Sequence, residues 1–377
     1  MRHGHVWVYR SDLADVPEVG SGALVSVADQ RKNLIGTALY SSASQIALRL
    51  VSSGAVADAD QLVRQRIRAA IGLRRKWIEN TDSYRFIFSE ADQLPGVVAD
   101  KYNDIVTVQF LSQATDQEWF RKALIETVQE EVRPASIIER VDERIREIEQ
   151  LPTRHSGLMT GTRTATIFEM NDVRFNFNAL EGQKTGAFLD QRENYAAAAR
   201  YARGEAMDVF CYQGGFALHL ARQCERVTAV DASRAALETG EQNESLNRSA
   251  NKNEIEWLEA NAFDLLKDYA VSGRQYDTIV LDPPAFAKTK KDLGAALRGY
   301  KEINLRALKM LRPGGVLATC SCSHHVAETD FLEMLREAAS DARRVVRVLE
   351  KRGQAKDHPV LLSVPETAYL KCVILQV

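Results

Sequence analysis

Three residues late in the chain have the side chains needed for chemistry on a planar nitrogen base. Cys322 lies in the segment TCSCS (319–323), and a deprotonated thiol is a strong nucleophile. Asp282 precedes two prolines of fixed φ, so its loop is rigid and exposes carbonyl oxygens that suit an exocyclic amine. Phe286 follows closely and offers a ring that can stack on a flipped base. We therefore predict catalysis by Cys322 and Asp282, with Phe286 binding the substrate.

Each of these residues also has a structural interpretation. A cysteine at a strand end is more often a small buried hydrophobe than a nucleophile, and a segment rich in proline can simply end a strand. Cys320 shares a face with Cys322 if the strand continues. The nucleophile interpretation is favoured for Cys322 because, in the usual sheet order, its strand end adjoins that of Asp282. His324 and His325 have no Cys or His partner at metal spacing, so we predict no metal site.

The stretch MDVFCYQGGFALHLARQCERVTAVD (207–231) has the pattern of the first half of a doubly wound nucleotide site. An apolar strand leads to a turn with Gly214 and Gly215, then a helix, then a second strand that ends on Asp231. An acid at that position accepts hydrogen bonds from ribose hydroxyls, and glycines let a ligand approach the backbone. The fingerprint G-x-G-x-x-G is absent, which disfavours a pyrophosphate. The predicted cofactor is therefore a nucleoside without phosphate, S-adenosylmethionine (SAM).

From residue 207 onward, strands alternate with helices and predict a mostly parallel α/β sheet of seven strands. Residues 1–55 read as short strands broken by turns, which is typical of a small β-barrel. Residues 81–177 predict a small α+β unit in which Pro152 to Thr166 form a connecting loop. The expected domains are 1–75, an RNA-binding β-barrel, 76–178, an α+β domain, and 179–377, the cofactor domain.

A basic helix over residues 60–79 places Arg64, Arg68 and Arg75 on one stripe, opposite an apolar face. This stripe is either a surface that contacts RNA phosphates or an ordinary solvated helix face. The polar segment 181–192 contains Lys184-Thr185 but lacks the glycine spacing of a P-loop, so we reject that motif. The segment is either a lid over the site or a linker.

Composition limits the class of protein. The 377 residues have a net charge of −2 and are 45% hydrophobic and 27% charged, as in globular proteins. No apolar run is long enough to span a membrane, and we find no signal peptide. Five cysteines without disulfide spacing indicate a reducing cytoplasm. The sequence leaves open whether the chain forms a homodimer.

At several motifs the sequence resembles the RlmI-type bacterial 23S ribosomal RNA cytosine-C5 methyltransferases. The matching segments are GHVWVY (4–9), GQKTGAFLDQREN (182–194), FCYQGGF (210–216), LDPPAF (281–286), RGYKEIN (298–304) and SCS (321–323). The resemblance implies a PUA domain, a small α+β domain and a class I SAM methyltransferase domain, with 23S ribosomal RNA as the partner. It assigns the nucleophile to Cys322, while Asn261 stands where an acid is commoner.

We predict that the cofactor-binding residues lie at successive strand ends and in the segment before the first strand. They are Phe210, Cys211, Tyr212, Gly214, Gly215, Asp231, Ala232, Asn261, Ala262, Asp282 and Gln191. The implied reaction forms 5-methylcytosine through a thiolate adduct at C6. Two alternatives stay open: a methyltransferase that acts on a base nitrogen, and a non-catalytic RNA-binding relative.

Overall fold

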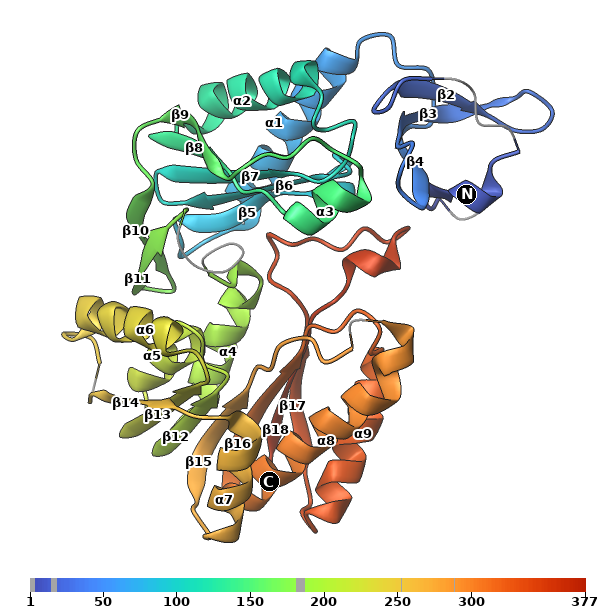
Figure 1. The fold of residues 1–377 in the computed structure, drawn as a ribbon. Coiled ribbons are helices and arrows are strands. Elements are labelled where there is room, and N and C mark those ends of the chain that lie inside the picture. Colours follow the sequence, from blue (N-terminus) through green and yellow to red (C-terminus); the bar gives the residue numbers. More distant parts are fainter. Residues whose placement is uncertain (1–3, 15–18, 181–186, 252, 288) are drawn as a thin grey trace. The chain divides into compact units, whose positions relative to one another are not determined.

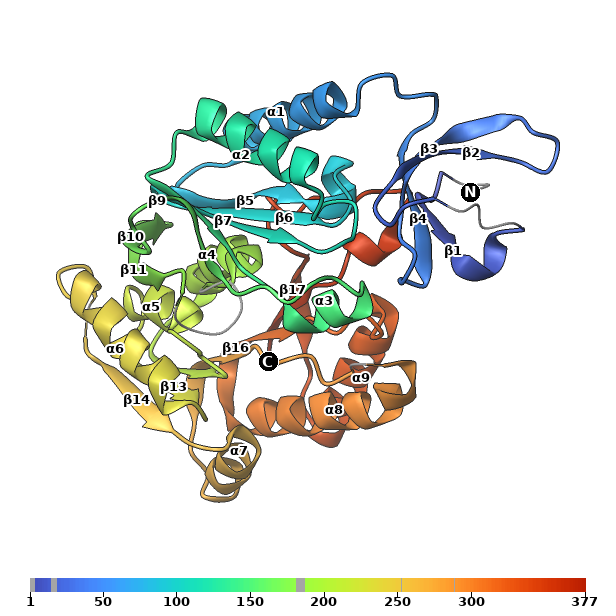
Figure 2. The same cartoon turned by 45° about the horizontal axis from the view of Figure 1, so that its top comes forward.

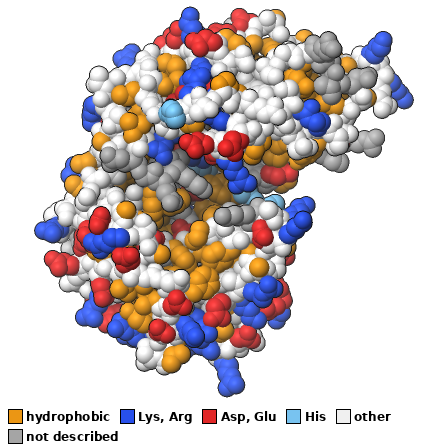
Figure 3. Space-filling view, viewed as in Figure 1, with side chains coloured by type: hydrophobic (Ala, Val, Ile, Leu, Met, Phe, Trp, Pro, Cys, Tyr) orange, Lys and Arg blue, Asp and Glu red, His pale blue; other side chains and the backbone are white. Residues whose placement is uncertain are grey.

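The computed structural model describes residues 4–14, 19–180, 187–251, 253–287 and 289–377 (Figure 1). The chain divides into two compact units. The first comprises Met1–Glu169, Phe177–Gly186 and Lys356–Thr367, and the second comprises Met170–Asn176, Ala187–Ala355 and Ala368–Val377. On the face drawn in Figure 3, cationic and anionic side chains are interspersed over both units, in keeping with the small net charge.

Four short strands near the N-terminus form an antiparallel sheet in the order β1-β4-β3-β2. They are β1 (Trp7–Tyr9), β2 (Leu24–Ala28), β3 (Leu34–Tyr40) and β4 (Ile46–Ser52). A small buried cluster of Val8, Ala38, Tyr40 and Leu48 holds them together. The predicted strands are confirmed. In the described residues, the pairing leaves β1 and β2 as edge strands of an open sheet.

A five-stranded sheet in the order β5-β6-β7-β8-β9 forms the rest of the first unit. Its elements are β5 (Ser83–Phe88), β6 (Val97–Tyr102), β7 (Ile105–Phe110), β8 (Ser136–Glu139), β9 (Gly157–Gly161), α1 (Ala59–Trp77), α2 (Glu118–Val132) and α3 (Glu143–Ile148). Helices α1 and α2 lie together on one face of the sheet (Figures 1 and 2). Ile67 and Ile71 of α1 join the core with Phe86, so α1 packs with this sheet. The domain boundaries at 75 and 178 stay a prediction.

The predicted loop between Pro152 and Thr166 is wrong where two strands occupy it, at Gly157–Gly161 and from Ala165 onward. Strand β9 pairs with β8, and β10 (Ala165–Met170) begins inside the same range and pairs with β11 (Val173–Asn178). The sequence of β9, GLMTG, has glycine at both ends and no clear alternation of apolar and polar residues. The open edge of β8 supplies the backbone partners that this segment's own pattern does not predict.

The second unit is built on a seven-stranded sheet in the order β14-β13-β12-β15-β16-β18-β17. Its strands are β12 (Glu205–Val209), β13 (Arg226–Asp231), β14 (Ile255–Glu259), β15 (Tyr276–Leu281), β16 (Leu311–Ser321), β17 (Arg347–Arg352) and β18 (Lys371–Gln376). Strands β12 to β16 pair in parallel, whereas β18 is antiparallel to both of its neighbours. The predicted, mostly parallel sheet is confirmed.

Helices cover both faces of this sheet (Figures 1 and 2). One face carries α4 (Arg192–Tyr201), α5 (Gly215–Ala221) and α6 (Arg234–Asn247), and the other carries α7 (Ala262–Val271), α8 (Leu293–Met310) and α9 (Glu328–Asp341). Strand order reverses between β12 and β15, and ligands of such sheets bind beyond the carboxyl ends of the strands at that point. Among the described residues, no helix combines the length and apolar character needed to cross a membrane.

Candidate active site

The turn after β12 depends on two glycines. Gly214 has a φ of 85°, a left-handed conformation that glycine adopts without strain. A Cβ at Gly214 would lie 2.6 Å from Cη2 of Trp257, and a Cβ at Gly215 would lie 2.5 Å from Cζ of Tyr195. The sequence suggested that these glycines admit a ligand. The structure adds that two packed aromatic rings leave no room for larger residues.

Asp231 ends β13 and ties the neighbouring loops together. One carboxylate oxygen accepts from the backbone N–H of Tyr212 at 2.9 Å, and the other accepts from that of Ser233 at 2.9 Å, with Ala232 between. A carboxylate has about four acceptor positions. About half of them therefore remain for ligand hydroxyls.

Asn261 and Ala262 begin α7 at the end of the next strand. Asn261 Oδ1 accepts from the backbone N–H of Phe263 at 2.9 Å and caps the helix. Its exposed amide nitrogen has no protein partner among the described residues. The predicted contact between Asn261 and the cofactor stays a prediction.

The sequence interpretation missed two further acids, one inside strand β12 and one in the turn Leu189–Gln191. Asp208, inside β12, is fully buried, and its Oδ2 accepts from the N–H of Ala217 at 2.8 Å. Its Oδ1 has no partner among the described residues, and burial raises the pKa of Asp208 well above its ordinary value. Asp190 accepts from the hydroxyl of Tyr369 at 2.6 Å. The available signals were an acid within an apolar strand and an acid within the segment 181–192, which was interpreted as either a lid or a linker.

Asp282 follows β15 and accepts from Nε2 of Gln191 at 3.0 Å. Burial, reinforced by the charge of Asp190, raises the pKa of Asp282 to about 7, while the bond from Gln191 opposes this shift. The amide of Gln191 holds Asp282, and the predicted contact of Gln191 with the cofactor stays a prediction. The first half of the segment 181–192, predicted as either a lid or a linker, lies outside the described residues together with the Lys184-Thr185 pair; the following turn Leu189–Gln191 leads into α4.

Cys322 follows β16, which pairs directly with β15, so the expected proximity of these two strand ends is present. Its partly exposed Sγ lies 4.0 Å from the carbonyl oxygen of Pro283. Burial raises the pKa of the Cys322 thiol to about 11, and the charges of Asp282 and Asp190 add to that rise. Cys320 is completely buried, as expected of a small core residue.

Lys371 is a cation at the site that the sequence did not reveal. Its Nζ donates to the carbonyl oxygens of Ser323 at 2.7 Å and Tyr369 at 2.8 Å. Burial lowers the pKa of Lys371 to about 8, and its charge favours the thiolate of Cys322. A lysine at the start of an apolar terminal strand carried no distinctive pattern.

Phe286 is partly buried against other aromatic rings. Its centroid lies 4.6 Å from that of Tyr300, and the N–H of the next residue, Ala287, donates to Ser323 Oγ at 3.2 Å. This bond fixes the loop that follows Asp282 beside the Cys322 segment. Stacking of Phe286 on a base stays a prediction.

The predicted RNA-contacting arginines of α1, here called the α1 arginine stripe, are all paired with carboxylates. The pairs are Arg64 with Asp60 and Glu126, Arg68 with Glu130 and Glu131, and Arg75 with Glu131. Most of these acids lie on α2, far away in sequence. The pairing favours the solvated helix face over the phosphate surface, which stays a prediction.

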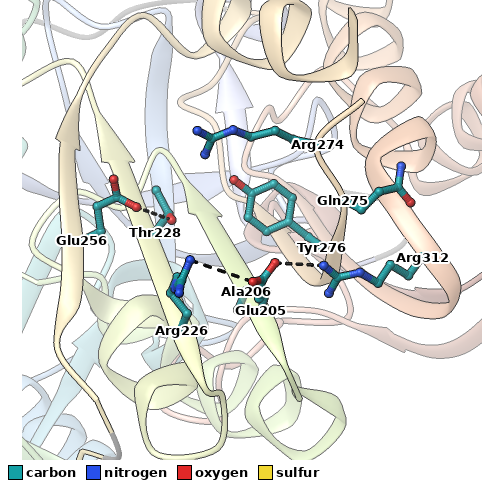
Figure 4. Close-up of a pocket in the computed structure, with 9 residues that line it drawn as sticks. All are labelled: Glu205, Ala206, Arg226, Thr228, Glu256, Arg274, Gln275, Tyr276 and Arg312. Atoms are coloured by element: carbon teal, nitrogen blue, oxygen red, sulfur yellow. Dashed lines mark hydrogen bonds and ion pairs between the residues drawn. The ribbon is translucent and has the colours of Figure 1, made fainter. Parts of the chain in front are cut away.

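A polar hollow of about 320 Å³ lies at the opposite, amino ends of the strands (Figure 4). Its charges largely satisfy one another: Glu205 pairs with Arg312 at 2.9 Å, and Glu256 accepts from Thr228 at 2.9 Å (Figure 4). The remaining lining residues are Ala206, Arg226, Arg274, Gln275 and Tyr276. Ligands of open α/β sheets bind at the carboxyl ends, so this hollow is separate from the candidate site.

The chemistry of the site fits a cationic nucleoside. Asp190, Asp208 and Asp282 raise one another's pKa or that of their neighbours, so they lie within electrostatic range of each other. The orphaned oxygen of buried Asp208 suits a positive group, and Asp231 suits ribose hydroxyls. SAM carries a sulfonium, an ammonium and a ribose, whereas a pyrophosphate would be repelled. Fold and site together define a class I SAM-dependent methyltransferase.

Comparisons with known proteins agree with this class. A PUA-like domain model matches residues 1–53, and a model of the S-adenosylmethionine-dependent methyltransferases matches residues 103–375. Ribosomal RNA large subunit methyltransferase I of Shewanella denitrificans is 36% identical over 385 residues, covering 99% of this chain and 95% of that protein. The same protein of Shewanella amazonensis is 35% identical with equal coverage. The chain belongs to this methyltransferase family.

A solved structure gives independent support for the fold. A methyltransferase complexed with SAH superposes with a TM-score of 0.85 at 18% identity, covering 100% of this chain and 96% of that one. Agreement over the whole length includes the N-terminal sheet, the central sheet and the methyltransferase sheet.

Proposed function

We propose that the protein forms 5-methylcytosine in 23S ribosomal RNA through a covalent bond between Cys322 and C6 of the target cytosine. The observation that carries this proposal is the placement of a partly exposed thiol beside the Asp282-Pro283 loop, at neighbouring strand ends. The relatives are named as methyltransferases of large-subunit ribosomal RNA. This name and the PUA-like domain support an RNA substrate.

Methylation at C5 of cytosine requires a covalent step that activates the ring. C5 of cytosine is a weak nucleophile until C6 is occupied, whereas a base nitrogen can attack a methyl group with its own lone pair. When the Cys322 thiolate bonds to C6, the C5–C6 π electrons become available at C5. A thiol that is not completely buried, beside the Asp282-Pro283 loop, therefore fits carbon methylation better than nitrogen methylation.

Asp282 balances charge during the addition. Placed at N3 and the 4-amino group, it stabilises the negative charge that enters the ring. SAM supplies the electrophilic methyl group. A base then accepts the C5 proton, the electrons of the C5–H bond restore the C5–C6 double bond, and the C6–S bond breaks to release the Cys322 thiolate. Lys371, held by two carbonyl oxygens, favours the thiolate state at both ends of the cycle.

The test uses a 23S ribosomal RNA transcript made with 5-fluorocytidine, incubated with enzyme and SAM. Fluorine does not leave C5 as a proton does, so the Cys322 adduct should persist through denaturing electrophoresis. Cys322→Ala should form no adduct, whereas Cys320→Ala should still form it, because Cys320 is buried and its loss leaves only a small cavity. Absence of an adduct with wild-type enzyme, or an adduct with Cys322→Ala, would remove the proposal.

A further inference from the structure

A chain of side-chain hydrogen bonds leads from Asp282 to strand β17. Gln191 Nε2 donates to Asp282 Oδ1 at 3.0 Å, Asn194 Nδ2 donates to Gln191 Oε1 at 2.6 Å, and Arg352 Nε donates to Asn194 Oδ1 at 2.9 Å. Gln191 and Asn194 are only 2% and 1% exposed, so water does not compete with these bonds. Glu350 anchors the far end by accepting from Arg352 Nη1 at 2.8 Å.

The two ends of this chain fix its direction. A guanidinium can only donate, so Asn194 must turn its carbonyl oxygen toward Arg352. Its NH₂ group is then the donor, and both hydrogens are used, one by Gln191 and one by the carbonyl oxygen of Gly353 at 3.1 Å. Gln191 must accept from Asn194 with its oxygen and present its own NH₂ group to Asp282. Neither amide can flip without losing a buried bond.

This direction determines how Asp282 can hold a proton. Because Oδ1 always accepts from Gln191, a proton on the carboxyl group must reside on Oδ2. With the pKa of Asp282 raised to about 7, the protonated form is populated at neutral pH. The titratable groups that interact with the carboxyl include Asp190, Asp208, Tyr195, Cys320 and Cys322, while Glu193 and Glu350 face Arg352.

We propose that the chain Arg352–Asn194–Gln191 selects cytosine as the target base by fixing Asp282 with its donor on Oδ2 and its acceptor on Oδ1. This inference rests on the proposed function. Cytosine offers an acceptor at N3 and a donor at its 4-amino group, so both atoms of the carboxylic acid are matched. Uracil offers the reverse, a donor at N3 and an acceptor at O4. Uracil would therefore face the acid donor-to-donor at N3 and acceptor-to-acceptor at O4. Without water to satisfy these groups, binding of uracil is strongly disfavoured. The three residues of the chain are positioning residues, since they act through Asp282 and do not contact the base themselves.

Asn194→Asp is the sharpest variant, because it keeps the side-chain size and reverses the direction. The new carboxylate still accepts from Arg352 but has no hydrogen to give Gln191. Gln191 must then rotate its amide, and its oxygen faces Asp282 Oδ1 and draws the proton there. Oδ2 becomes an acceptor, which suits N3–H of uracil. We expect at least a tenfold loss of trapping by 5-fluorocytidine RNA and a relative gain with 5-fluorouridine RNA, with SAM affinity unchanged within about twofold.

Arg352 supplies a milder test with a matched control. Arg352→Met removes the terminal donor and weakens the bond that lowers the pKa of Asp282. Trapping requires the protonated acid, so its loss toward high pH should shift to a higher pH. Arg352→Lys keeps a donor and should restore the wild-type profile. Arg347→Met removes an exposed arginine from the same strand outside the chain and should change neither the profile nor base preference.

The outcomes separate the two proposals. If wild-type enzyme forms no adduct with 5-fluorocytidine RNA, the proposed function fails. If wild-type enzyme forms the adduct but Asn194→Asp and Arg352→Met keep its base preference and pH profile, only the selecting role of the chain is overturned. Thermal unfolding and SAM titration of each variant show whether it is folded. If Asn194→Asp does not fold, the comparison of Arg352→Met with Arg352→Lys still tests the selecting role.

Discussion

Replacement of Asp231 by alanine should weaken SAM binding and loosen the turn beside it. The variant removes the acceptor positions that remain for ribose hydroxyls. A hydrogen bond to a charged acceptor contributes about 1.5–3 kcal/mol. At about 1.4 kcal/mol for each factor of ten, the dissociation constant for SAM should rise by roughly 10- to 150-fold.

Part of this effect is structural, and a control can measure that part. Asp231→Ala also removes the acceptors of the Tyr212 and Ser233 amides, each worth about 1 kcal/mol of the free energy of unfolding. Ser233→Ala is the matched control, because it removes only the hydroxyl that caps α6, also worth about 1 kcal/mol, and leaves the Asp231 carboxylate intact.

Isothermal titration calorimetry with SAM, together with thermal unfolding without it, distinguishes the two effects. Ser233→Ala should be destabilised yet bind SAM as wild type does. Asp231→Ala should be destabilised and bind SAM weakly. If Asp231→Ala binds SAM within twofold of wild type, the ribose assignment is refuted and Asp231 only braces the turn.

Three further predictions follow from the same contacts. Gly214→Ala should fold poorly, because its Cβ would meet Trp257 in a left-handed turn, whereas Gly294→Ala, whose Cβ would make only an ordinary contact with Arg298 Nη1 at 3.7 Å, should unfold at nearly the wild-type temperature. Replacing the α1 arginine stripe by glutamines should change the salt dependence of RNA binding little, since each arginine already faces a carboxylate; a slope lower by about 2.7 would instead show three phosphate contacts. Alkylation of Cys322 by iodoacetamide without SAM should rise with pH through about 11, because the thiolate is the reactive form, and bound SAM should lower that midpoint; a midpoint near 8.5 without SAM would contradict the buried, acid-lined site.

Local patterns predicted much of this fold. The strand, glycine turn, helix and acid of 207–231 appear as β12, α5 and β13, and the polar residues at successive strand ends gather at one edge because parallel strands align their carboxyl ends. Strand β9 was predicted as part of a loop because its formation depends on pairing with the edge of β8. Its own five residues lack a strand's alternation.

Contacts between distant parts of the chain could not be predicted from spacing. The acids that pair with the α1 arginine stripe come from α2, and no rule of helix periodicity connects the two helices. Arg352 and Asn194 lie 158 residues apart and meet only once the sheet is assembled. The hydrogen bonds of Gln191 to Asp282 and Asn194 likewise depend on which groups flank it, so the sequence placed Gln191 at the site without revealing these partners.

The central claim is tested most directly by identifying the methylated nucleoside. Unmodified 23S ribosomal RNA should be incubated with the enzyme and SAM that carries a labelled methyl group, then digested and analysed by mass spectrometry. The account predicts label in 5-methylcytidine, and no label when Cys322→Ala replaces the wild-type enzyme. Label in an N-methylated nucleoside, or label that persists with Cys322→Ala, would contradict it.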